Sequence, residues 1–122
     1  MHMGSGSGAR NNCLIDSLRQ VLRCPGDASV CASVREMLRL EFPEPRQRDY
    51  VGPANFLTLD LHWAAVVRHL AQLTGVAVTP EELTVACVTT AAGDGAVEGT
   101  GARRVHLFNH GNSHFDPLLP TD

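Results

Sequence analysis

The chain has 122 residues, is 43% hydrophobic and carries a formal net charge of −3. A chain of this length forms one domain and buries roughly two-thirds of its unfolded surface, so its core needs no disulfide or metal. The acidic balance and the scattered positions of its ten basic residues, all arginine, argue against nucleic-acid binding. Because no apolar run approaches the roughly 18 residues of a membrane span, no membrane association is expected.

The first residues of the chain are not expected to belong to the fold. Residues 1–8, Met-His-Met-Gly-Ser-Gly-Ser-Gly, have the composition of a tag followed by a linker, and no signal peptide is recognised. We therefore assign a single domain to residues 9–122. The four cysteines show no spacing typical of a disulfide framework, which predicts reduced thiols.

Three amphipathic helices are predicted in the first two-thirds of the domain. Apolar residues recur at helical spacing over 13–23, and Cys-Pro-Gly ends this segment. A second helix begins at a cap at residue 27 or 29 and is stopped by Pro43, and a third runs from about residue 58 or 60 to Thr74. The prolines between them predict a surface loop.

The chain then changes from helices to strands. Residues 79–82, Thr-Pro-Glu-Glu, are typical of a capped turn, and the β-branched segment 83–89 predicts a strand. A turn at 91–95 precedes a short strand at 97–100. Turn residues at 109–112 separate strands at 105–108 and 113–118, which should pair as an antiparallel hairpin. The expected fold class is α+β, with N-terminal helices packed on a small antiparallel sheet.

A cysteine and a distant His-x-Asp indicate thiol chemistry. Cys13 is expected at the start of the first helix, where the helix dipole and a nearby His⁺ would lower its pKa to roughly 3.5–7.5. His114 and Asp116 lie two apart on a strand, so their side chains share a face and the carboxylate can orient the imidazole. This set is typical of papain-type enzymes, whereas the alternative is a buried cysteine and a hairpin histidine.

Two short segments resemble a known family. Asn12-Cys13-Leu14, followed by an amphipathic helix, resembles the Gly-Asn-Cys-Leu nucleophile motif of ovarian-tumour (OTU) family cysteine peptidases. His114-Phe115-Asp116 resembles their closing His-aromatic-Asp/Asn motif. Arg10 stands where the family has an Asp, and Asn11 replaces its Gly. The short chain is also similar to the compact papain-fold domains at the C-termini of bacterial toxins and effectors.

The resemblance implies a papain-like fold and a peptidase or isopeptidase that acts on ubiquitin or a ubiquitin-like protein, with no cofactor and no metal. Cys13 is implied as the nucleophile and His114 as the general base that Asp116 orients. The Cys13 amide and the Asn12 side chain would stabilise the oxyanion. His114 is expected to matter more than the other hairpin histidines, because only it has a carboxylate at i+2.

Three further residues are candidates for substrate contact. Phe115 would line the channel, as the family's aromatic residue does, although strand parity also fits a core position. Trp63, the only tryptophan, and Asn11 are the other two, and a tryptophan on an amphipathic helix is commonly a core residue. His106, His110 and His114 would align as metal ligands on a helix, but the hairpin sequence breaks that geometry.

Alternatives to a peptidase remain at this stage. A glutamine deamidase on the same scaffold needs the same Cys-His-Asp set, with water completing the reaction. An inactive interaction module follows if Arg10 and Asn11 disrupt the oxyanion loop. We expect a monomer that is secreted by a bacterium and acts in the reducing cytosol of a host or target cell.

Overall fold

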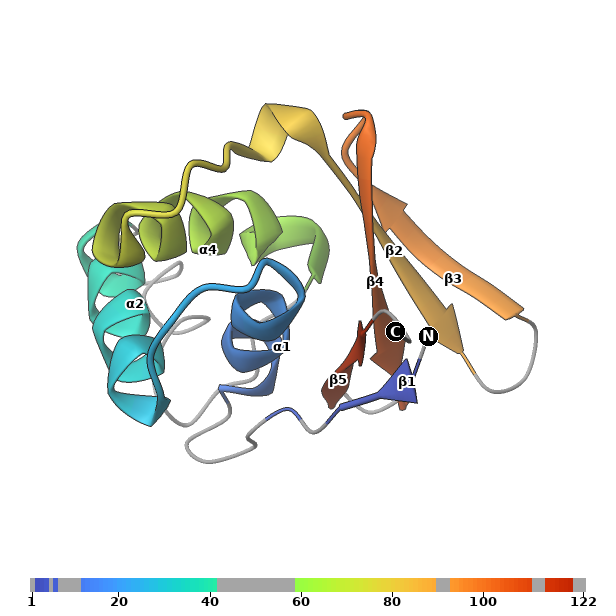
Figure 1. Ribbon diagram of the computed structural model, residues 1–122, viewed down its shortest axis with the longest axis horizontal. Coiled ribbons are helices and arrows are strands. Elements are labelled where there is room, and N and C mark those ends of the chain that lie inside the picture. Colours follow the sequence, from blue (N-terminus) through green and yellow to red (C-terminus); the bar gives the residue numbers. More distant parts are fainter. Residues whose placement is uncertain are drawn as a thin grey trace.

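A computed structural model describes residues 2–4, 6, 12–41, 59–89, 93–110 and 114–119. Helices α1 (Cys13–Val21), α2 (Ala28–Glu41) and α4 (Leu59–Thr74) form one layer, and a five-stranded sheet lies beside them (Figure 1). The predicted α+β class is therefore confirmed. None of the described helices is long and apolar enough to cross a lipid bilayer.

Helix α1 ends two residues before the predicted position. Arg23 adopts a positive φ of 57°, a left-handed conformation in which the helix cannot continue. The Arg19 side chain reaches the freed end and donates hydrogen bonds to the carbonyl oxygens of Cys24 at 3.3 Å and Gly26 at 3.1 Å. These contacts hold the connection between α1 and α2 against the end of α1.

The sheet has the strand order β1-β5-β4-β2-β3. The strands are β1 (His2–Met3), β2 (Leu83–Thr89), β3 (Gly93–Glu98), β4 (Arg103–Asn109) and β5 (Phe115–Leu119), and the 3-10 turn η2 (Pro80–Glu82) precedes β2. The predicted antiparallel hairpin, β4 with β5, is confirmed.

The sheet is mixed and not wholly antiparallel, because β4 pairs in parallel with β2. Strand β3 returns along one edge of β2, and the chain then crosses to the other edge, so β4 runs in the same direction as β2. The crossing is close: a Cβ on Gly101 would collide with the backbone of Glu82 and Leu83, and the Gly101 amide donates to the Leu83 carbonyl at 3.0 Å. Glycine permits this approach.

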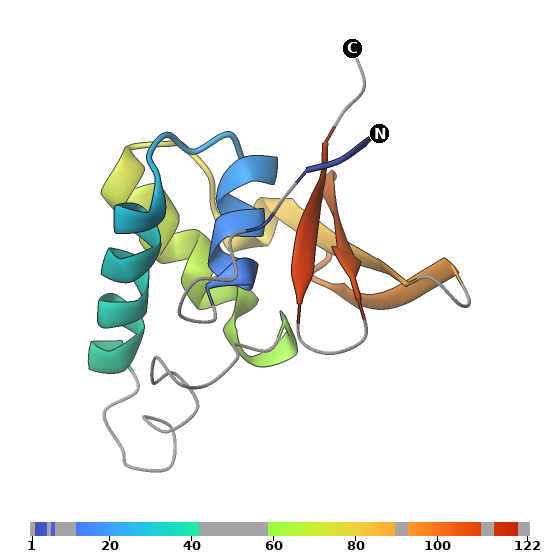
Figure 2. The ribbon, with the colours of Figure 1, turned by 90° about the horizontal axis from the view of Figure 1, so that it is seen from below.

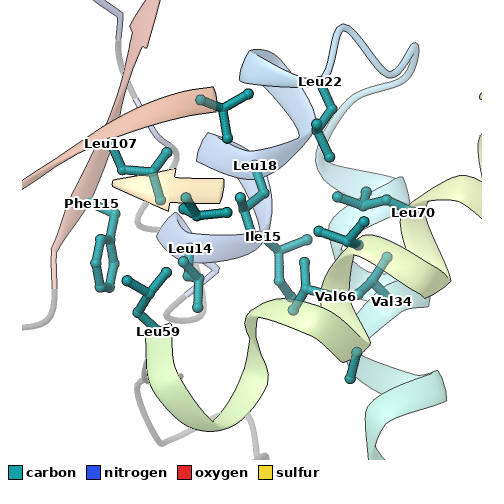
Figure 3. Packing of buried hydrophobic residues seen from close by; sticks show 14 of the residues in the cluster. Leu14, Ile15, Leu18, Leu22, Val34, Leu59, Val66, Leu70, Leu107 and Phe115 are labelled. Carbon is teal, nitrogen blue, oxygen red and sulfur yellow. The ribbon is translucent and has the colours of Figure 1, made fainter. Parts of the chain in front are cut away.

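The core lies between α1, α4 and the sheet (Figure 3). Leu14, Ile15 and Leu18, on one face of α1, are each 0% exposed. Leu70 of α4 and Leu107 of β4 are part of the same cluster. Full burial stabilises each of these side chains by about 1.5–3 kcal/mol, so packing fixes α1 against the sheet.

Residues 1–8, assigned above to a tag and linker, contact the sheet where they are described. His2 and Met3 form β1, which pairs antiparallel with Leu119 and Leu118 at the edge of β5 (Figure 2). The Gly4 amide donates to the Pro117 carbonyl at 2.8 Å. This segment therefore lies beside β5 whatever its origin, and its identity as a tag stays a prediction.

Candidate active site

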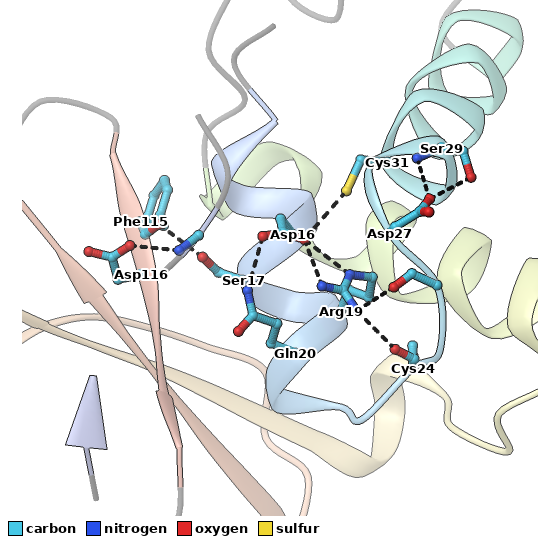
Figure 4. Close-up of polar contacts among 12 residues, drawn as sticks. Asp16, Ser17, Arg19, Gln20, Cys24, Asp27, Ser29, Cys31, Phe115 and Asp116 are labelled. Atoms are coloured by element: carbon cyan, nitrogen blue, oxygen red, sulfur yellow. Dashed lines mark hydrogen bonds and ion pairs between the residues drawn. The ribbon is translucent and has the colours of Figure 1, made fainter. Parts of the chain in front are cut away.

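The first turn of α1 lies against the start of β5. The Ser17 hydroxyl donates a 2.9 Å hydrogen bond to the Phe115 carbonyl, as Figure 4 shows. Gly6 fits into this junction, where an added Cβ would collide with the Phe115 carbonyl and the Ser17 hydroxyl. The two elements are therefore held in close contact, and Cys13, at the start of α1, lies beside the strand that carries Asp116.

Cys13 is a buried thiol, 2% exposed. Burial raises its pKa above the ordinary value, while hydrogen bonds from the backbone amides of Phe115, Leu14 and Cys13 lower it, and burial prevails. The nearby Asp116 charge acts in the same direction as burial. The predicted lowering of the Cys13 pKa is therefore wrong, because the helix start does supply its amides but desolvation outweighs them.

The structure brings together His114 and Asp116, the two residues of the predicted His-x-Asp pair. His114 Nε2 lies 3.2 Å from Asp116 Oδ1. The Asp116 side chain is 12% exposed, whereas that of His114 is 41% exposed. A buried carboxylate thus supports a more exposed imidazole.

His110 contacts the same carboxylate, which the sequence interpretation missed. Its Nε2 lies 2.7 Å from Asp116 Oδ2, and its ring centroid is 5.2 Å from that of His114. The two histidines face each other across the hairpin, where the His110 amide donates to the His114 carbonyl at 3.0 Å. His114 has its carboxylate at i+2, as predicted, but His110 shares that carboxylate. Antiparallel pairing, applied to the predicted hairpin, was the signal that could have placed His110 opposite His114.

Asp116 stays ionised in this setting. Burial alone would raise its pKa, but a 2.8 Å hydrogen bond from the Gly6 amide, the hydrogen bond with His110 and the charge of His114 together lower the pKa below its usual value. The carboxylate therefore accepts hydrogen bonds from one backbone amide and two imidazoles at neutral pH.

Asn12 is buried next to Cys13 and is held by a buried arginine. Arg35 Nε donates to Asn12 Oδ1 at 2.7 Å, and both residues are nearly inaccessible, at 5% and 6% exposure. Burial lowers the pKa of Arg35. Because arginine has donors only, the amide oxygen of Asn12 must face it, and the NH₂ group of Asn12 points elsewhere.

The other predicted site residues lie in different environments. Phe115 is 3% exposed and belongs to the core cluster. Trp63 is half-buried, packs against that cluster and closely approaches Gly99. Asn11 and Arg10 lie outside the described residues.

A hollow with a volume of about 390 Å³ lies away from these groups. It is lined by Val21, Arg23, Arg103, Arg104, Val105, His106 and Leu118. Arg23 therefore lies on the same surface as Arg103 and Arg104, which are distant from it in the sequence. This surface is at the end of β4 opposite His110.

Comparison with known proteins shows similarity in structure and not in sequence. No protein-family model and no curated protein matches the chain. An OTU deubiquitinase from Wolbachia pipientis wMel superposes with a TM-score of 0.51 at 18% identity, over 97% of this chain and 87% of that one. An OTU deubiquitinase from Wolbachia pipientis wMel bound to ubiquitin gives a TM-score of 0.50 at 18% identity, over 97% of this chain and 94% of that one. The chain therefore has an OTU-like fold.

Proposed function

We propose that this protein is a cysteine hydrolase that cleaves ubiquitin or ubiquitin-like conjugates. The observation that carries the proposal is the junction of α1 and β5, where Cys13 contacts the backbone of Phe115, the residue between His114 and Asp116 in the sequence. The OTU-like fold and the ubiquitin bound to one structural neighbour support the choice of substrate.

The proposed reaction is acyl transfer through a thioester. The Cys13 thiol is protonated at rest because burial raises its pKa, so His114 takes the proton as the sulfur attacks the scissile carbonyl. The carbon–nitrogen bond then breaks, and His114 returns the proton to the leaving amine. Water activated by His114 hydrolyses the thioester and restores the thiol.

Two neighbouring groups support the charges that develop. Ionised Asp116 stabilises the imidazolium of His114, from which it lies 3.2 Å away. The Cys13 amide and the NH₂ group of Asn12 are assigned to the oxyanion, and Arg35 selects that orientation of Asn12 by taking its oxygen. Arg35 is thus a positioning residue in this mechanism.

The proposed setting is that of a secreted bacterial effector or toxin domain, monomeric, which acts in the cytosol of a host or target cell. The resemblance of its two motifs to the OTU family and its short chain support this setting. Reduced thiols in that compartment would keep Cys13 available for catalysis.

The test is covalent capture by ubiquitin carrying an electrophile at its C-terminus. We expect one adduct, mapped by mass spectrometry to Cys13 and absent in Cys13→Ala. The matched control is Cys87→Ala, because Cys87 is equally buried but lies on β2. Capture at another cysteine would contradict the nucleophile. Absence of capture, together with ammonia release from a glutamine-containing protein, would replace the peptidase with the deamidase.

A further inference from the structure

We propose that His110, His114 and Asp116 form a binding site for Zn²⁺. One ligand atom from each residue lies within 4.8 Å of the other two. The closest approaches are 2.7 Å between His110 Nε2 and Asp116 Oδ2 and 3.2 Å between His114 Nε2 and Asp116 Oδ1. Ligand atoms bound to tetrahedral zinc at about 2.0–2.2 Å are spaced roughly 3.3 Å apart, so small side-chain rotations suffice.

The chemistry of the three ligands favours zinc over hard cations. Two neutral imidazoles and one carboxylate form the ligand set of many zinc sites that keep a fourth position open, whereas Mg²⁺ and Ca²⁺ prefer oxygen ligands alone. The fourth position would be filled by water.

The backbone holds the three ligands in place before any ion binds. The hydrogen bond from the His110 amide to the His114 carbonyl fixes the two histidines across the hairpin. Asp116 pairs with Phe108 in the register of β4 and β5, and the Gly6 amide holds its Oδ1. The ring of Phe108 packs against that of His110 at 4.7 Å between centroids. Such support restricts the orientation of ligand side chains.

The site is open to solvent on the histidine side. The His110 and His114 side chains are 38% and 41% exposed, so an ion reaches their nitrogens without opening the core. Binding through His114 Nε2 would displace the contact with Asp116 that supports the imidazolium during hydrolysis. Inhibition of hydrolysis by Zn²⁺ therefore follows, and this consequence rests on the proposed function, whereas the binding itself does not.

The direct test is calorimetric titration of the whole chain with zinc chloride. We expect one ion per chain, and His110→Ala and Asp116→Asn should each weaken binding by at least about 10–100-fold, the loss seen when even the partners that orient a metal's ligands are removed. The matched controls are His106→Ala, on β4 and in the arginine-lined hollow, and His2→Ala, at the N-terminus. Both should bind as the parent chain does.

Two outcomes would overturn the site: unchanged affinity in folded His110→Ala, or equal loss in His106→Ala. Circular dichroism establishes that each variant is folded, and His110→Gln serves if His110→Ala is not. Cys13→Ala separates the two proposals, because it should bind Zn²⁺ even though it cannot hydrolyse a substrate. If the parent chain binds Zn²⁺ but hydrolyses no ubiquitin conjugate, the zinc site stands and the hydrolase proposal fails.

Discussion

The two ends of the β4–β5 hairpin carry similar residues in opposite electrostatic settings. At one end, a buried carboxylate, Asp116, receives His110, His114 and a backbone amide. At the other end, Arg104 Nε lies 3.4 Å from His106 Nε2, and within the described residues neither Arg103 nor Arg104 forms an ion pair with a carboxylate. The shared carboxylate, and not the spacing of the histidines, therefore distinguishes the candidate site from the arginine-lined end of the hairpin.

Replacing a histidine at each end gives the largest expected contrast. His114→Ala should lower the rate of ubiquitin-conjugate hydrolysis by a factor of roughly 10²–10⁴, the usual loss when a general base is removed. His106→Ala should hydrolyse at the parent rate, because it lies at the uncompensated end. Steady-state kinetics of both variants measure this difference. Equal rates for the two would show that the two ends do not differ in function.

Replacing His110 is expected to lower the rate of hydrolysis less than replacing His114. It contacts Asp116 at 2.7 Å but is 38% exposed, so its hydrogen bond to the charged carboxylate is partly replaced by water in a variant. Such a bond contributes about 1–2 kcal/mol, so His110→Ala should lower kcat/KM by roughly ten-fold. The KM should stay near the parent value, since His110 acts through Asp116. A loss as large as that of His114→Ala would instead make His110 the base.

Acid stability provides a third contrast. The Asp116 pKa is lowered in the folded state, so the charged form stabilises the fold above the unfolded value near 3.8, and this stability is lost as pH falls through the folded pKa. Asp116→Asn should therefore have a Tm several degrees below the parent at pH 7, for a loss of about 1–2 kcal/mol. The gap should close as the pH falls below 3.8. Thermal melts across this range measure it.

Local patterns in the sequence predicted the helices, and contacts distant in sequence explain what they missed. Apolar spacing placed α1 within two residues of its observed end, since that spacing depends on neighbouring residues alone. The parallel pairing of β2 with β4 depends on which edge the chain returns to after β3, which no local pattern reports.

The candidate site shows the same division. The helix-start amides around Cys13 were predictable, but the burial that reverses its pKa shift comes from packing of α1 on β5. His114 and Asp116 were paired correctly because they share a strand, whereas His110 approaches Asp116 from across the hairpin. Arg35, which holds Asn12, lies on a different helix and gave no signal.

The smallest expected effect is at the arginine-lined end of the hairpin. Arg23, Arg103 and Arg104 place like charges around one hollow, and all three are exposed. Removing one charge in Arg104→Ser should relieve repulsion and change the free energy of unfolding by at most about 0.5 kcal/mol, in the stabilising direction. The Debye length is about 10 Å at 0.1 M ionic strength and about 3 Å at 1 M. The gain in stability should therefore disappear at 1 M salt. Denaturant melts at both salt concentrations test it. A destabilised variant at low salt would show that an anion or a carboxylate compensates these charges, and the contrast between the two ends would then be one of degree.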